Sequence, residues 1–145
     1  MKHIYYSGQV LWSQMDANNH LRHSSYADLC AQARINMLTD VGLSMQELEN
    51  LKVGPILFRE ELVYLREVRL NELINVQIEI TRYNHSNSRF SFRHSIWKEN
   101  EVLAAVVTVD GAWMDLKKRK LTTLPEEWTS YFDKIPKSED YQETK

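Results

Sequence analysis

The sequence predicts one α+β domain, in which a long helix packs against a sheet of five antiparallel strands. Two observations indicate this: a single long stretch with helical spacing of apolar residues, then four long stretches with strand periodicity joined by short polar turns. Short turns make neighbouring strands antiparallel, and the chain lacks the alternation of strands and helices that builds a parallel sheet. Its 145 residues are the size of one domain.

The N-terminal segment predicts the first strand and an irregular connection. Residues 3–14 mix aromatic and β-branched side chains around Gly8, a pattern typical of a strand with a bend at the glycine. Residues 15–23 (MDANNHLRH) have no sustained apolar period and are expected to form an irregular loop. This loop leads directly into the helix.

The helix is predicted from its apolar spacing and its ends. Ser24 or Ser25 is expected to accept a hydrogen bond from a free N–H of the first turn, and Gly42 is expected to end the helix. Residues 44–51 predict a short second helix with Ser44 as its N-cap. The apolar residues of the long helix recur at spacings of three and four and predict one buried stripe: Tyr26, Leu29, Ala33, Ile35, Met37 and Leu38.

Four further strands are predicted over residues 56–68, 73–83, 89–97 and 102–116. The second and third alternate apolar and polar residues, and the last is nearly continuously apolar, which suits a central strand buried on both faces. His94 alternates with core phenylalanines and is expected to be a buried, hydrogen-bonded histidine. Residues 1–133 form the predicted domain, and the polar tail 134–145 is expected to be frayed.

Composition and charge exclude several classes of protein. The chain has 18 Lys and Arg against 20 Asp and Glu, so no global positive field would hold nucleic acid. Cys30 is the only cysteine, which excludes an intramolecular disulfide, and its place in the helix favours a small buried side chain. No signal peptide or apolar run long enough to span a membrane is present, so a cytoplasmic location is expected.

Asp16 is the residue whose position most clearly indicates chemistry. It follows an apolar strand and shares its loop with His20 and His23, directly before the helix start. A helix N-terminus offers free N–H groups and a partial positive charge, which suit an oxygen that becomes negative during acyl transfer. The alternative is that the Asp and Asn residues of this loop simply form its turns.

The residues around Asp16 resemble a family signature. Asp16-Ala-Asn-Asn-His20-Leu-Arg-His23-Ser-Ser-Tyr26, followed by Ala-Arg in the helix, resembles the signature of the 4-hydroxybenzoyl-CoA thioesterase and acyl-CoA thioesterase branch of the hotdog superfamily. The likeness covers roughly residues 10–128 and continues in three downstream segments: Tyr64-Leu-Arg66, residues 88–92 with 102–105, and Leu124-Pro125-Glu126.

This resemblance implies a fold, an activity and a set of site residues. The fold is the hotdog, a long helix wrapped by an antiparallel sheet, assembled as a homodimer or homotetramer with active sites at subunit interfaces. The activity is hydrolysis of an acyl-CoA thioester, with Asp16 as general base or nucleophile and the backbone N–H at His23 as the oxyanion donor. His20 and Tyr26 would shape the substrate pocket.

Some assignments and functions remain alternatives. Arg89 is a candidate for binding the phosphates of CoA, with Arg82, Arg93 and the basic run 117–120 as rivals. The substrate could instead be an acyl group on a carrier protein, or the domain could bind acyl groups without catalysis. Gln32 stands where relatives often have an acidic residue, which removes a second candidate carboxylate. No metal or cofactor is expected, because the histidines and the cysteine lack ligand spacing.

Overall fold

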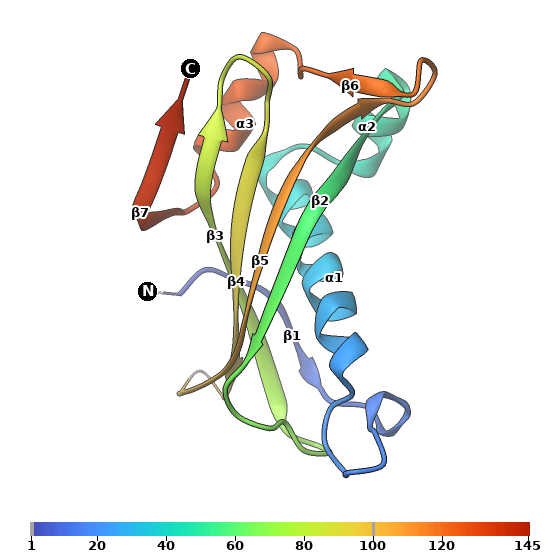
Figure 1. Ribbon diagram of the computed structural model, residues 1–145, viewed down its shortest axis with the longest axis vertical. Helices are drawn as coiled ribbons and strands as arrows, with labels where there is room; N and C mark the ends of the chain where they lie inside the picture. Colours follow the sequence, from blue (N-terminus) through green and yellow to red (C-terminus); the bar gives the residue numbers. More distant parts are fainter. Residues whose placement is uncertain (1, 100) are drawn as a thin grey trace.

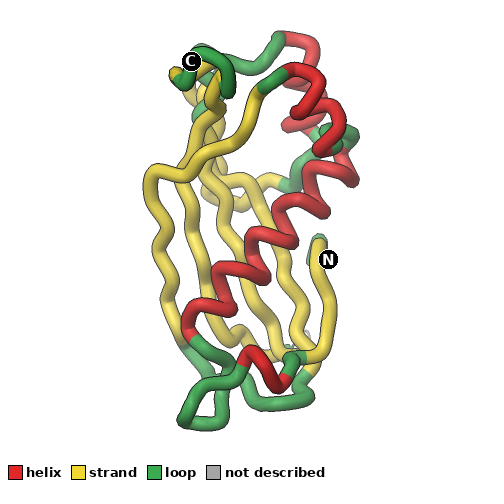
Figure 2. The backbone as a smooth tube through the Cα atoms, turned by 90° about the vertical axis from the view of Figure 1, so that its right-hand side faces the viewer, coloured by secondary structure: helices red, strands yellow, loops and turns green. Residues whose placement is uncertain are grey.

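The computed structural model describes residues 2–99 and 101–145 as a curved sheet wrapped around one long helix (Figures 1 and 2). The helices are α1 (His23–Val41), α2 (Met45–Leu51) and α3 (Thr129–Asp133), with short 3-10 turns η1 (Trp12–Gln14) and η2 (Glu126–Trp128). The strands are β1 (Ile4–Gln9), β2 (Val53–Tyr64), β3 (Leu73–Asn84), β4 (Phe90–Lys98), β5 (Val102–Asp115), β6 (Lys120–Thr122) and β7 (Lys137–Thr144). None of the helices in these described ranges is long and apolar enough to cross a membrane.

The sheet has the predicted antiparallel core and two additional strands. Its order among the described residues is β1-β3-β4-β5-β2, and these five neighbours are antiparallel. Strand β6 extends β5, and β7 pairs with β3 in parallel. The α+β prediction is therefore confirmed, with five strands in the main path and two short additions that the sequence pattern did not indicate.

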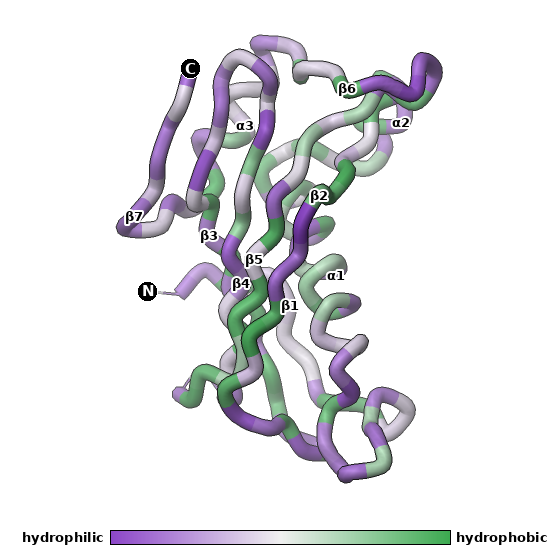
Figure 3. The backbone as a smooth tube through the Cα atoms, viewed as in Figure 1, coloured by the Kyte–Doolittle hydropathy of each residue, from purple (hydrophilic) through white to green (hydrophobic). Residues whose placement is uncertain are grey.

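The core lies between α1 and the concave face of the sheet. The alternating residues of β3 turn one set of side chains inward, and Ile74, Val76, Ile78 and Ile80 are at most 1% exposed. Figure 3 shows the corresponding concentration of hydrophobic residues along the strands. Burial raises the pKa of the Cys30 thiol to about 12, so this thiol stays protonated and is a packing group, as its position in the helix predicted.

The start of α1 differs from the prediction. The helix begins at His23, its N-cap is Arg22, and no side chain caps it. The hydroxyl of Ser25 is buried without a hydrogen-bond partner, and the hydroxyl of Ser24 accepts a hydrogen bond from Arg22 Nε at 2.9 Å. Contacts of the preceding loop, described below, fix the entry of the chain. The predicted end is confirmed, because Gly42 adopts the left-handed φ of 108°.

The C-terminal tail is also ordered, so the prediction of fraying from residue 134 is wrong. Ile135 is 2% exposed and anchors the chain beneath α3, after which β7 runs beside β3. Asp140 then accepts two hydrogen bonds from the Arg93 guanidinium, at 2.9 and 3.2 Å. The segment is polar because β7 is an edge strand that pairs its backbone with β3 while most of its side chains are exposed.

His94 is a buried, fully hydrogen-bonded histidine, as predicted. Its Nδ1 lies 2.8 Å from the carbonyl oxygen of Val107, and its Nε2 lies 3.1 Å from Arg34 Nη1. The arginine can only donate, so Nε2 accepts and Nδ1 carries the proton. Burial, and secondarily the Arg34 charge, lower the pKa of His94 to about 3. The imidazole is therefore neutral in the folded protein.

A pH dependence of stability follows from His94. Unfolding returns the imidazole to its ordinary pKa of 6.5, so between that value and about 3 the unfolded chain binds a proton that the folded chain does not. We expect this group to lower the free energy of unfolding by about 1.4 kcal/mol for each pH unit below 6.5. Urea unfolding at several pH values measures the slope. A His94→Gln variant should lose this component, whereas His3→Gln should keep it.

Candidate active site

Asp16 organises the loop between η1 and α1. Its carboxylate Oδ1 accepts hydrogen bonds from the backbone N–H groups of Asn18 (2.9 Å) and His20 (3.3 Å). Its own N–H donates to the His20 carbonyl at 2.9 Å, and Met15 forms an isolated antiparallel bridge with Leu21. Asn19 has a positive φ of 60°, a conformation that asparagine tolerates at tight turns. Asp16 is thus held by a compact turn in a fixed position.

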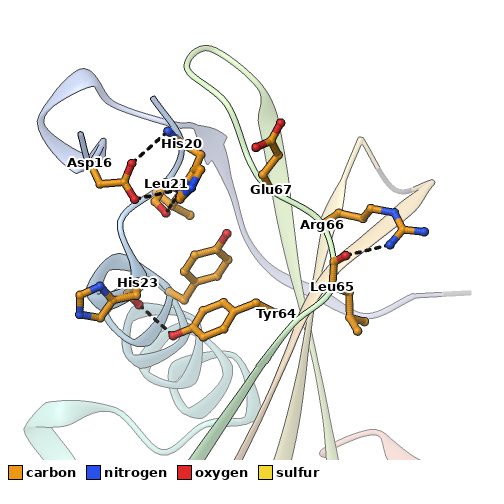
Figure 4. A pocket seen from close by; sticks show the side chains of 9 residues that line it. Asp16, His20, Leu21, His23, Tyr64, Leu65, Arg66 and Glu67 are labelled. Atoms are coloured by element: carbon orange, nitrogen blue, oxygen red, sulfur yellow. Dashed lines mark hydrogen bonds and ion pairs between the residues drawn. The ribbon is translucent and has the colours of Figure 1, made fainter. Parts of the chain in front are cut away.

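The second oxygen of Asp16 faces His20. His20 Nδ1 lies 3.0 Å from Asp16 Oδ2, and the two side chains are about a quarter to a third exposed. Figure 4 shows the pair side by side at the edge of the cavity. One carboxylate oxygen therefore accepts the hydrogen bonds of the turn, and the other contacts an imidazole. The carboxylate is oriented in this way while it stays partly exposed to solvent.

The loop delivers the chain to the helix start in one orientation. Leu21 is 1% exposed, and its N–H donates to the Val68 carbonyl at 2.6 Å. The Arg22 N–H donates to the Gln14 carbonyl at 2.7 Å, which ties the entry of α1 to the end of η1. The first N–H groups of a helix carry the positive end of the helix dipole; here those of His23 and Ser24 come first, and the Ser25 N–H already donates to the Arg22 carbonyl at 2.9 Å.

Asp16 and the start of α1 line one cavity of about 420 Å³ (Figure 4). Tyr26 and Tyr64 meet edge to face in its wall, with ring centroids 5.1 Å apart, and the Tyr64 hydroxyl lies 3.5 Å from the His23 carbonyl oxygen. Burial and the nearby Tyr64 and Asp16 raise the pKa of Tyr26 to about 12, so its phenol stays protonated. The structure thus brings together four of the five predicted site residues: Asp16, His20, His23 and Tyr26.

Five further residues line the cavity that sequence reasoning did not assign to the site: Leu21, Tyr64, Leu65, Arg66 and Glu67. Leu65, Arg66 and Glu67 follow β2 directly and close the wall opposite α1. Glu67 is a second carboxylate at the cavity, but Arg69 binds it through Nη2 at 2.6 Å and Nε at 2.9 Å, which lowers its pKa. The Arg66 side chain points away from Asp16 in Figure 4. The resemblance of Tyr64-Leu-Arg66 to a family segment was the sequence signal for this wall, but it assigned these residues no role in the site.

The fifth predicted residue, Arg89, lies elsewhere in the protomer. Its guanidinium sits 5.1 Å from the ring centroid of Phe58, and it lines a separate cavity with residues 121–123. Arg82 and Arg93 border another surface cavity that also contains Asp140. The basic run 117–120 lies at the turn between β5 and β6, at the opposite end of the molecule from the Asp16 loop (Figure 1). In the described part of the chain, the two cavities that Asp16 lines include none of these basic groups.

Within the described ranges, no group of three or more His, Cys, Asp and Glu side chains is placed to hold a metal ion. Asp16 and His20 form a pair, and among the described residues no third His, Cys, Asp or Glu side chain joins them to make a metal site.

Comparison with known proteins identifies the class. The model of the thioesterase-like superfamily matches residues 10–132, so this chain belongs to that superfamily, and the predicted hotdog fold is confirmed. The match includes the Asp16 loop, α1 and the strands β2, β3, β4 and β5, whereas β1 precedes it and β7 follows it. No curated protein matches the sequence.

Several solved structures share the fold over nearly their whole length. A hypothetical protein from Staphylococcus aureus, solved in complex with CoA, has a TM-score of 0.85 at 22% identity and covers 98% of this chain and 91% of its own. A 1,4-dihydroxy-2-naphthoyl-CoA thioesterase from Synechocystis has a TM-score of 0.78 at 20% identity, covering 90% and 96%. A DHNA-CoA thioesterase from Staphylococcus aureus has a TM-score of 0.81 at 17% identity, covering 89% and 87%. At these identities the likeness establishes the common fold.

Proposed function

We propose that this chain hydrolyses an acyl-CoA thioester to the free acid and CoA, with Asp16 as the catalytic carboxylate. The observation that carries the proposal is that the Asp16 carboxylate and the N-terminus of α1 line the same cavity. One supplies a base or nucleophile and the other supplies N–H donors for the oxygen that becomes negative. Membership of the thioesterase-like superfamily supports the reaction class, and the CoA complex and CoA thioesterases of similar fold support a CoA substrate.

Two routes fit this arrangement. In one, a carboxylate oxygen of Asp16 attacks the thioester carbonyl carbon, the C–S bond breaks, the thiolate takes up a proton, and water hydrolyses the resulting anhydride. In the other, Asp16 takes a proton from water as the water oxygen attacks, and collapse expels the thiolate. In both, the N–H at His23 would donate to the carbonyl oxygen as its charge grows. His20 is a positioning residue for Asp16, through the 3.0 Å contact of Nδ1 with Oδ2.

A substrate panel tests this function. Short, medium, long and aromatic acyl-CoAs would be compared by the rate of thiol release, and at least one should be hydrolysed in an Asp16-dependent manner. Absence of turnover with the whole panel, with retained acyl-CoA binding, would favour a non-catalytic acyl-binding module. Turnover of acyl-carrier-protein thioesters but not acyl-CoAs would favour the carrier-protein alternative.

We expect hydrolysis to persist after exhaustive chelation and dialysis. A thioester carbonyl is already electrophilic, and an ordinary thiol leaving group has a pKa of about 8.5, so the bond needs no Lewis acid. The helix N-terminus would supply the positive end that a metal otherwise provides. Thiol release before and after chelation measures this. Loss of activity that zinc or manganese restores would instead make Asp16 and His20 metal ligands.

A further inference from the structure

A second cavity, of about 170 Å³, lies between α1 and the sheet and shares no lining residue with the Asp16 cavity. Its wall is mostly apolar and comes from four elements, with Arg34, Ile35 and Leu38 on α1, Leu57 on β2, Phe92 on β4 and Trp113 on β5. An apolar cavity of about 150 Å³ holds a benzene molecule in another protein. The volume here therefore suits an apolar body of about that size.

Arg34 places a positive charge at this apolar cavity without a direct ion pair, although the nearby charge of Glu60 partly offsets the effect of burial on its pKa. Its guanidinium forms one hydrogen bond, with Nη1 3.1 Å from His94 Nε2, and the described residues give it no ion pair with a carboxylate. Burial lowers the pKa of Arg34, but an arginine remains protonated in proteins. His94 is neutral, so most of the guanidinium donors are left for another partner. A half-buried cation in this state favours an anion.

Trp113 adds a large apolar side chain to the same wall. Its side chain is 1% exposed, and its indole N–H is buried without a hydrogen-bond partner among the described residues. Arg34 thus supplies the N–H donors of the wall, and no carboxylate side chain lines the cavity. The chemical complement of such a wall is a compact apolar molecule that carries an anionic acceptor.

We propose that this cavity binds a small monocarboxylate, with the carboxylate on Arg34 and the apolar part against Leu38, Phe92 and Trp113. Benzoate has the charge and the ring size that the cavity accommodates. The proposal does not depend on Asp16 catalysis, because the two cavities have no wall residue in common.

The test titrates benzoate, and benzyl alcohol as a neutral molecule of similar shape, into the full-length protein by ligand-observed NMR. We expect saturable benzoate binding that Arg34→Met weakens at least about tenfold, the scale of a lost charge-assisted hydrogen bond, while the weaker binding of benzyl alcohol is unchanged. Ala31 is exposed and lines the cavity, so Ala31→Phe should block both ligands without disturbing the core. Gln32→Phe, one residue along the exposed surface of α1, is the matched control and should bind normally.

Several results would overturn the proposal. They are the absence of saturable benzoate binding at millimolar concentration, equal benzoate affinity in wild type and Arg34→Met, or unchanged binding in Ala31→Phe. Circular dichroism establishes whether each variant is folded. If Arg34→Met is not folded, the result for Ala31→Phe alone decides the question. Asp16→Asn should retain benzoate binding, since loss in that variant would place benzoate in the Asp16 cavity.

Discussion

Asp16→Asn is expected to keep the fold and to lower thioester turnover by at least about a hundredfold, the scale of losing a general base. Asparagine has the same shape and retains one oxygen, which can still accept from the Asn18 and His20 N–H groups that bind Oδ1 at 2.9 and 3.3 Å. The turn that delivers the chain to α1 therefore survives. The amide nitrogen that replaces the other oxygen can neither accept a proton from water nor attack a carbonyl carbon. Steady-state thiol release with the best acyl-CoA of the panel measures the effect.

Glu67→Gln is the matched control, because Glu67 is the other carboxylate that lines the cavity. Arg69 binds its Oε1 through two nitrogens, so this carboxylate is less free to act as a base. We expect Glu67→Gln to change turnover only slightly. Near-normal turnover of a folded Asp16→Asn protein would contradict the mechanism, and a large loss in Glu67→Gln alone would move the catalytic role to Glu67.

The main sheet and long helix could be predicted because their hydrophobic periods are regular. The alternation in residues 73–83 places Ile74, Val76 and Ile78 in the core, where each is at most 1% exposed. β7 could not be predicted in this way, since its register depends on the Arg93 and Asp140 side chains and on backbone pairing with β3. The predicted serine cap of α1 is absent for a related reason. Backbone hydrogen bonds from Leu21 and Arg22 to distant carbonyls fix the helix start without a side-chain cap.

The candidate site also contains residues that the sequence could predict and residues that it could not. Asp16, His20, His23 and Tyr26 lie within eleven consecutive residues, so a motif resemblance could identify them together. Residues 65–67 reach the same cavity only because β2 ends beside the start of α1, a relation that depends on the three-dimensional fold. Arg89 was assigned on charge alone, and charge does not specify at which end of the sheet a residue lies.

The second large effect concerns assembly, and we expect the protein to form at least a homodimer through β2. This strand has twelve residues, lies at the edge of the sheet and pairs only with β5 among the described strands. Its middle is hydrophilic and its flanks are hydrophobic (Figure 3), with Phe58 53% and Val63 43% exposed. A long, uncovered edge with apolar flanks is a template for pairing with another chain. The opposite edge of the main path, β1, is half as long.

Antiparallel pairing of two β2 strands about Glu60 would set Arg59 against Glu61 of the partner subunit and Phe58 against the partner's Leu62. This register places two opposite-charge pairs and two apolar pairs across from each other, which favours pairing and must outweigh the like-charge contact of Glu60 with Glu60 of the partner subunit at its centre. Sedimentation at micromolar concentration should then give a mass of at least twice the 17.2 kDa chain.

Phe58→Glu combined with Val63→Glu should give a monomer, because like charges and lost apolar contacts act at the edge. Leu73→Glu changes a residue that is also 53% exposed but lies on β3, and it should leave the mass unchanged. A stable, active wild-type monomer would contradict this assembly, and it would also mean that residues of a single chain suffice for hydrolysis.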